Sequence, residues 1–281
     1  MTPIGTWLLA LFSEFIGTAI LILLGNGSVA AVSFKRMNAN QSGKYILIAL
    51  GWGFAVFIGA AVSIAMGGSG WLNPAVAISN SIASSNGTWV DPLVLKGIAA
   101  LNGNGVVDLS IKGGAIAATF FIALIFEILG AMFGQIILDF INFKFIKDRE
   151  NDILTIRGMH CTTPVYSNKK DRALIYNVGY EFVGTIVLLG AILAFNQVSA
   201  LSNPIFVALV IMSIGISLGS ATGYAINPAR DLAPRLVFFG LIKQFRRNEY
   251  TSTICDWQYS WVPIAGPMVA GLIIGLIGLA V

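Results

Sequence analysis

Charged residues are scarce in this sequence. Of its 281 residues, 11% are Asp, Glu, Lys or Arg, whereas 56% are hydrophobic. Soluble domains carry about a quarter charged residues, so the composition excludes an ordinary soluble protein and indicates one that lies in a lipid bilayer. The net charge of +4 comes from Lys and Arg residues that gather in loops rather than along one stripe, which argues against nucleic acid as a partner.

Histidine and cysteine are nearly absent as well. The chain has one His and two Cys, and Cys161 and Cys255 lack the spacing of metal ligands. We therefore expect no metal, no cofactor and no catalytic residues, because the usual nucleophile and metal-binding constellations are missing. The two cysteines could form a disulfide if their loops lie on the same side of the membrane, and the sequence leaves that open.

Long apolar runs are what the sequence does have. A helix of roughly 20 apolar residues crosses a hydrocarbon core about 30 Å thick. We expect six such transmembrane helices, over residues 8–32, 45–66, 114–142, 173–195, 204–222 and 261–281. Two shorter runs, 74–84 and 228–240, cannot cross alone, so each is either a surface helix or a re-entrant half-helix. Residues 85–112 should form a loop with a short helix.

The two halves of the chain repeat each other. SEFIGTAILILLG at 13–25 resembles YEFVGTIVLLGAI at 180–192 and aligns Glu14 with Glu181. Each half has three spans, and Asn-Pro-Ala follows the second. Because three is odd, the second half enters the membrane from the opposite side. This predicts a single channel domain over 1–281, with inverted repeats at about 1–143 and 173–281 joined by loop 144–172.

The repeated tripeptide has a clear physical meaning. Asn is a strong N-cap and Pro is favoured at the first helical position, so each copy begins a short helix. Two such helix N-termini, meeting at mid-membrane, would carry partial positive charge and disfavour cations and protons. The Asn amides could still donate to a passing hydroxyl. Two matched copies favour a pore lined by Asn73, Pro74, Ala75, Asn227, Pro228 and Ala229.

The paired motifs and the repeat make the chain similar to a known family of membrane proteins. Over essentially its whole length it resembles the aquaporin family, the major intrinsic proteins, and NPARD at 227–231 is similar to the glycerol-conducting branch. The resemblance implies an all-α integral membrane fold of six helices and two half-helices in an inverted repeat, a homotetramer with one pore per subunit, and a multi-pass location in the cell membrane. It implies glycerol, water and small polyols as solutes and the lipid bilayer as surroundings.

The resemblance also implies a selectivity filter, formed by Trp52, Gly215, Tyr224 and Arg230. Arg230 would hold two hydroxyls of a polyol, while Trp52 and Tyr224 face its carbon backbone and Gly215 leaves room. Water-selective members have His at the fifth-span position, and His160 lies instead in the long loop. Tyr224 departs from the usual Phe, and Trp71 stands where the family often has His.

Four acidic residues stand within or beside the apolar segments of the sequence. Glu14 and Glu181 lie inside apolar spans, where an ionisable group needs a partner. Either they support the re-entrant loops by accepting backbone N–H groups, as the resemblance favours, or they are coupling sites of an ion- or proton-driven secondary transporter. Asp231 is expected to shape its loop, with Arg235 as a possible partner. Glu127, where the family often has Gln, is either protonated or bonded to a neighbouring loop.

Two indications of membrane orientation disagree in this sequence. The resemblance implies that both termini face the cytoplasm, which leaves the loops 33–44, 143–172 and 241–260 outside. Most Lys and Arg residues lie in those three loops, whereas cytoplasmic loops usually carry the excess of positive charge.

Overall fold

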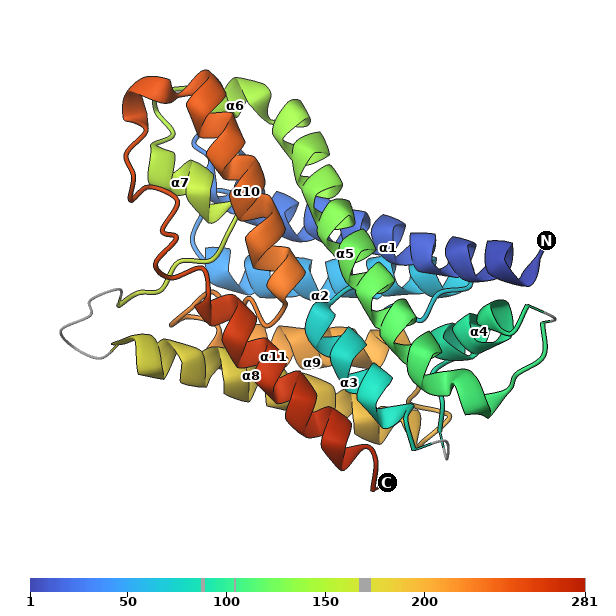
Figure 1. The fold of residues 1–281 in the computed structure, drawn as a ribbon. Helices are drawn as coiled ribbons and strands as arrows, with labels where there is room; N and C mark the ends of the chain where they lie inside the picture. The colour runs from blue at the N-terminus through green and yellow to red at the C-terminus, as the bar shows by residue number, and fades with distance from the viewer. Residues whose placement is uncertain (87–88, 104, 167–172, 281) are drawn as a thin grey trace.

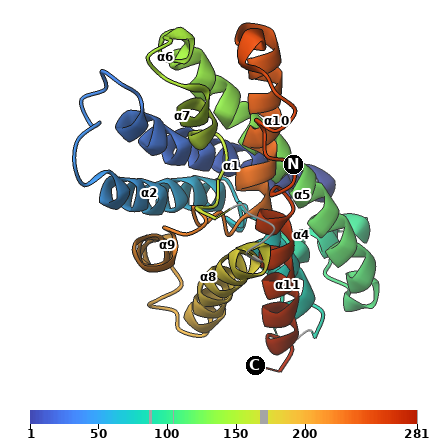
Figure 2. The same ribbon diagram turned by 90° about the vertical axis from the view of Figure 1, so that its left-hand side faces the viewer.

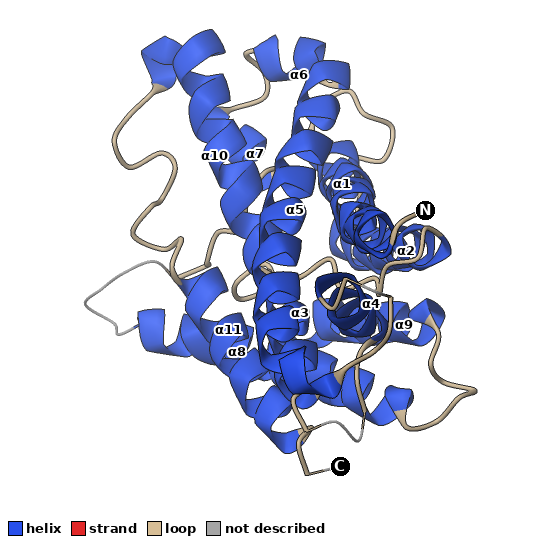
Figure 3. Cartoon of the chain, turned by 45° about the vertical axis from the view of Figure 1, so that its right-hand side comes forward, coloured by secondary structure: helices blue, strands red, loops and turns tan. Residues whose placement is uncertain are grey.

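The computed structural model describes residues 1–86, 89–103, 105–166 and 173–280, and within these ranges all regular structure is helical (Figure 3). The elements are α1 (Pro3–Ser33), α2 (Lys44–Ala65), α3 (Pro74–Ala83), α4 (Pro92–Leu101), η1 (Leu109–Ile111), α5 (Lys112–Ile141), α6 (Phe143–Lys147), α7 (Ile153–Gly158), α8 (Ala173–Asn196), α9 (Pro204–Leu218), α10 (Pro228–Phe245), η3 (Arg247–Glu249) and α11 (Val262–Ile277).

Each predicted span contains a helix, but two of the helices are shorter than predicted. By length and composition, α1, α2, α8 and the segment Leu109–Ile141 can cross a bilayer. Helices α9 and α11 are apolar but have only 15 and 16 residues, which corresponds to about 24 Å at most. Turns take up residues 219–222 of the fifth predicted span and residues 278–279 of the sixth.

The two Asn-Pro-Ala segments each start a helix that runs away from the centre of the molecule. Figure 1 shows α3 and α10 extending in opposite directions from a common middle. The extent of α3 agrees with the prediction, whereas α10 continues five residues beyond the predicted end at 240. It continues because Phe238, Leu241 and Ile242 are buried with residues of α6 and α7 in one apolar cluster, and hydropathy along the chain does not show that packing.

Helix packing follows the repeat. Helix α1 packs against α2 and α5, and in the same way α8 packs against α9 and α11 (Figure 2). Each half-helix contacts the third span of the other half, α3 against α11 and α10 against α5, while α2 meets α9 across the centre. The halves are therefore interlocked, and neither half-helix is covered by its own half alone.

Glycine pairs make two of these contacts possible. On α5, a Cβ atom at Gly130 would lie 2.3 Å from the Phe15 carbonyl oxygen, and one at Gly134 would lie 2.2 Å from that of Ala19. On α11, Gly271 and Gly275 face the α3 backbone in the same manner. Small residues four apart let helices approach closely in membranes.

We predict that Gly134→Ala lowers the stability of the protein by about 1–3 kcal/mol, because the added methyl group must push α5 away from α1. Thermal unfolding in detergent measures the change. Gly179→Ala on α8 is the control, since a Cβ there meets nothing within 4 Å. Equal unfolding temperatures for the two variants would contradict the close contact.

Candidate pore

Two crossed hydrogen bonds join the half-helices at their N-termini. Asn73 Nδ2 donates to the Ile226 carbonyl at 2.8 Å, and Asn227 Nδ2 donates to the Leu72 carbonyl at 2.8 Å. Each Asn thus bonds to the residue that precedes the other. The bonds hold the two halves together at the centre of the molecule.

The same Asn side chains cap their own helices. Asn73 Oδ1 accepts from Ala75 N at 2.9 Å, and Asn227 Oδ1 accepts from Ala229 N and Arg230 N at 3.0 and 3.2 Å. An amide NH₂ group has two hydrogens. One of these hydrogens is bonded to the carbonyl of the opposite loop. Each Asn therefore keeps one N–H for a solute, whereas a free amide would offer two.

The residue before each Asn has a strained backbone. Leu72 and Ile226 have φ values of 53° and 40°, in the left-handed region that costs non-glycine residues energy. Their N–H groups donate to Glu14 Oε2 at 2.9 Å and to Glu181 Oε2 at 2.7 Å. Because each N–H is held by a glutamate and each carbonyl by the opposite Asn, the strained conformation is fixed from both sides.

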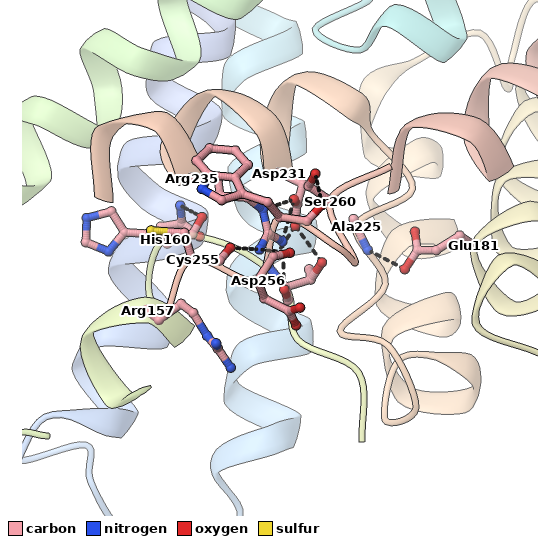
Figure 4. A network of polar contacts seen from close by, with 12 residues as sticks. Arg157, His160, Glu181, Ala225, Asp231, Arg235, Cys255, Asp256 and Ser260 are labelled. Atoms are coloured by element: carbon pink, nitrogen blue, oxygen red, sulfur yellow. Dashed lines mark hydrogen bonds and ion pairs between the residues drawn. The ribbon is translucent and has the colours of Figure 1, made fainter. Parts of the chain in front are cut away.

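Glu14 and Glu181 are fully buried, and their carboxylates accept hydrogen bonds from the backbone N–H groups of the re-entrant loops. Glu14 Oε1 also accepts from the backbone N–H groups of Ser69 at 3.1 Å and Gly70 at 2.8 Å. Glu181 Oε1 accepts from Ala225 N at 3.1 Å (Figure 4). Both carboxyl oxygens of each glutamate therefore hold a re-entrant loop, as a structural role requires.

Glu127 lies next to the first motif. Its Oε1 accepts from Asn73 N at 3.1 Å, while Oε2 has no hydrogen-bond partner among the described residues. Of the two alternatives from the sequence, the structure shows the bond to a neighbouring loop. The sequence could not tell which loop, because α5 is remote from residue 73 along the chain.

A cavity of about 400 Å³ passes the crossed Asn residues and is lined by both halves. On α2 it is bordered by Trp52, Val56, Ala60 and Ile64, which recur every fourth residue and so share one face of the helix. Twelve residues of helix correspond to a path about 18 Å long. Asn73, Asn227, Leu72 and Ile226 also line this path.

Three of the four predicted filter residues meet at one end of the cavity. The Arg230 guanidinium carbon lies 4.1 Å from the ring centroid of Trp52, and Trp52, Tyr224 and Arg230 all line the cavity. Arg230 is 5% exposed, and its Nη1 has no hydrogen-bond partner within the described residues. A fixed cation over an aromatic ring thus retains donors for a solute.

Gly215 differs from the expectation, because it is not among the residues that line the cavity. A Cβ atom there would lie 2.9 Å from Tyr224 Cζ and 3.0 Å from its hydroxyl oxygen. Gly219, one turn further, faces the same ring at 2.3 Å. The missing side chain therefore makes room for Tyr224, and only through Tyr224 does it affect the pore.

Asp231 is not among the residues that line the cavity and lies in a buried network of polar contacts (Figure 4). Its Oδ1 accepts from Arg235 Nε at 2.9 Å and Nη2 at 2.7 Å, and its Oδ2 accepts from Thr162 N at 2.8 Å. Arg235 Nη1 continues to the Cys255 carbonyl at 2.7 Å. The pair ties α10 to the loops on that side of the protein, so Arg235 is the partner of Asp231.

The scarce His and Cys residues are buried and take no part in the cavity lining. Cys161 and Cys255 are both free thiols, and burial raises the pKa of the Cys161 thiol to about 12. His160 lies in the 144–172 loop but is fully buried, with its ring nitrogens 2.8 Å from the Ile156 carbonyl and 3.0 Å from the Asp139 carboxylate. No metal-binding cluster is found among the described residues.

Comparison with known proteins identifies the family. The family model described as "Major intrinsic protein" matches residues 5–91 and 109–277. The chain therefore belongs to the major intrinsic protein family, a family of membrane channels. The resemblance seen in the sequence is confirmed.

Individual relatives agree with this assignment. The chain is 38% identical over 267 residues to the "Probable glycerol uptake facilitator protein" of Mycoplasmoides gallisepticum, covering 94% of both chains. It is also 38% identical over 265 residues to "Glycerol uptake facilitator protein 3" of Lactiplantibacillus plantarum, covering 94% of this chain and 92% of the relative. The solved structure of the aquaglyceroporin from Plasmodium falciparum matches with a TM-score of 0.70 and 26% identity, over 98% of this chain and 96% of that one. The predicted fold class is confirmed.

We predict that Glu181→Ala destabilises the protein by about 2–6 kcal/mol, since the N–H groups of Ala225 and Ile226 each lose a buried acceptor at about 1–3 kcal/mol apiece. Glu181→Gln keeps one acceptor oxygen and should cost about half as much. Thermal unfolding in detergent compares the two. If both variants unfold at the wild-type temperature, Glu181 does not hold the loop.

Proposed function

We propose that this chain is a passive channel for glycerol and other small uncharged solutes, with water, across the cell membrane. The observation that carries the proposal is the pairing of Arg230 with Trp52 at a cavity that runs past both Asn-Pro-Ala motifs. The relatives named as glycerol facilitators support the same solute class.

Arg230, Trp52 and Tyr224 suit a polyol because they offer two different surfaces. A polyol carries hydroxyl groups along one edge and C–H groups along the other. Arg230 donates to the hydroxyls in a fixed geometry, while the rings of Trp52 and Tyr224 contact the carbon chain. Gly215 contributes because its lack of a side chain leaves space for the Tyr224 ring.

Ions and protons are excluded by charge and by desolvation. The N-termini of α3 and α10 meet beside the cavity and contribute partial positive charge, and Arg230 adds a full one. A cation that entered would lose water of hydration, and Glu14, Glu181 and Asp231 are absent from the cavity lining. Asp91 does line the cavity, but both of its oxygens already accept hydrogen bonds from protein donors.

A coupled secondary transporter was the competing function, and the geometry gives it no support. Coupling through Glu14 and Glu181 would require carboxylates that can bind and release a cation or proton. Both oxygens of each accept backbone N–H groups of the re-entrant loops. If the carboxylates released these N–H groups, the strained backbone of Leu72 and Ile226 would no longer be held, and the loops at the centre of the pore would lose their support.

The proposal includes a homotetramer in which each subunit conducts by itself. Its support is the family resemblance together with the position of the cavity, which is enclosed by residues of one chain. Neighbouring subunits then serve to cover apolar surface and are not needed to complete the pore.

We predict that glycerol flux into proteoliposomes is the same with and without a proton or sodium gradient, because a passive pore couples to neither. Stopped-flow light scattering measures the flux, with empty liposomes as the control. Glycerol flux that rises with a gradient would overturn the passive mechanism.

We predict that Trp52→His combined with Gly215→His suppresses glycerol permeability about tenfold more than water permeability. The imidazole at 215 displaces the Tyr224 ring that Gly215 accommodates and so narrows the pore, while the imidazole at 52 replaces the apolar indole wall with a smaller polar ring. Gly179→His on α8, where a Cβ meets nothing, is the matched control. Unchanged glycerol permeability in the double variant would remove these residues from the filter.

A further inference from the structure

Helix α4 is an addition to the family pattern. The family model matches residues 5–91 and resumes at 109, so the unmatched stretch contains all of α4 (Pro92–Leu101). The helix packs against α1 and α5 (Figure 1) and buries Leu93, Val94 and Ile98. An inserted helix that buries its apolar side in the core is a built part of the fold and not a surface loop.

Helix α4 is attached to the loop that precedes the first Asn-Pro-Ala motif. The Lys96 ammonium donates to the Gly67 carbonyl. At the start of the helix, Asp91 Oδ1 accepts from Leu93 N at 2.8 Å and from Ser69 Oγ at 2.5 Å. One side chain thus caps α4 and holds the loop.

The other oxygen of Asp91 holds Trp71. Asp91 Oδ2 accepts from Trp71 Nε1 at 3.0 Å, and the Asn80 amide of α3 also donates to it at 3.4 Å. Asp91 is 3% exposed, and both of its oxygens are occupied by protein donors. It therefore acts on the pore only through the groups that it orients.

Trp71 and Asp91 both line the cavity, at the end away from Arg230. Trp71 follows Gly70, whose added Cβ would lie 3.2 Å from the side chain of Ala60. Ala60 is eight residues along α2 from Trp52, which places this level about 12 Å from the Arg230 end. Because the indole N–H is taken up by Asp91, Trp71 can present only its apolar ring to a solute.

The geometry points to Trp71 as a second specificity-determining residue of the pore, with Asp91 as its positioning residue. This inference rests on the proposed glycerol function and adds a second aromatic station, near the opposite end of the path. A solute that has passed Arg230 and the Asn pair must slide its carbon edge past the Trp71 ring. Asp91, the N-cap residue of the added helix α4, supplies the acceptor that keeps the ring at the wall.

Variants of Trp71 and Asp91 test this in proteoliposomes by stopped-flow light scattering with glycerol, xylitol and water. Trp71→Ala removes the ring and should raise the xylitol-to-glycerol permeability ratio about tenfold, the lower end of the discrimination that a small steric contact provides. Trp71→Phe keeps a ring without needing Asp91 and should keep the xylitol-to-glycerol permeability ratio of the wild type. If Trp71→Ala is not inserted, Trp71→Leu makes the same measurement.

Asp91→Asn separates positioning from helix capping. Asn is as good an N-cap as Asp, so its oxygen can still serve Leu93, but its NH₂ group faces the donors of Trp71 and Asn80. The released ring enters the path, and glycerol permeability should fall about fivefold, the worth of one hydrogen bond, with water less affected. In the Trp71→Phe background the same change should have no effect. Asp152→Asn is the matched control, because Asp152 caps α7 by accepting from Thr155 N at 2.7 Å and does not line the cavity.

The outcomes are distinguishable. A wild-type protein that does not conduct glycerol overturns the proposed function. If the wild type conducts and Trp71→Ala leaves the xylitol-to-glycerol ratio unchanged, Trp71 is not a specificity residue. If Asp91→Asn lowers glycerol permeability equally in the Trp71→Phe background, Asp91 has only a structural role. A raised ratio together with loss of the Asp91→Asn effect in that background supports both assignments.

Discussion

The crossed hydrogen bonds between the two Asn-Pro-Ala segments are the constraint on which the rest of the structure depends. For each Asn to reach the other loop, the carbonyls of Leu72 and Ile226 must turn toward the centre, and that places both residues in the left-handed region. Their N–H groups then need an acceptor in an apolar interior. Glu14 and Glu181 supply it, which explains why a buried carboxylate recurs at the same place in each half.

The position of the two half-helices also depends on how the spans around them pack. A half-helix has too little surface to be held by its own half, so each one packs against the third span of the other half. The glycine pairs on α5 and α11 let those spans approach neighbouring backbones. Pore geometry and fold stability are therefore coupled, since a change that separates the spans also loosens the loops that carry Asn73 and Asn227.

The sequence predicts those features that depend on neighbours along the chain or on the internal repeat. The six spans, the two half-helices and the relation of Glu14 to Glu181 are of this kind. Features set by side chains from distant segments could not be predicted. The place of the Tyr224 ring over Gly215, the extension of α10 and the burial of His160 against Asp139 all depend on packing. Asp91 is the plainest case, because along the chain it is one polar residue in a connector.

Hydrogen bonds from both halves of the chain hold the centre of the pore, and this has a consequence for how the protein serves a cell. The crossed Asn bonds, the two glutamates and the network of Asp231 and Arg235 hold the described loops at the centre of the pore. Because these carboxylates serve the loops and bind no driving ion, transport has no preferred direction, and the solute leaves as readily as it enters. Net uptake then depends on chemistry elsewhere that consumes the solute after it arrives, and the channel sets only how fast the two sides equalise.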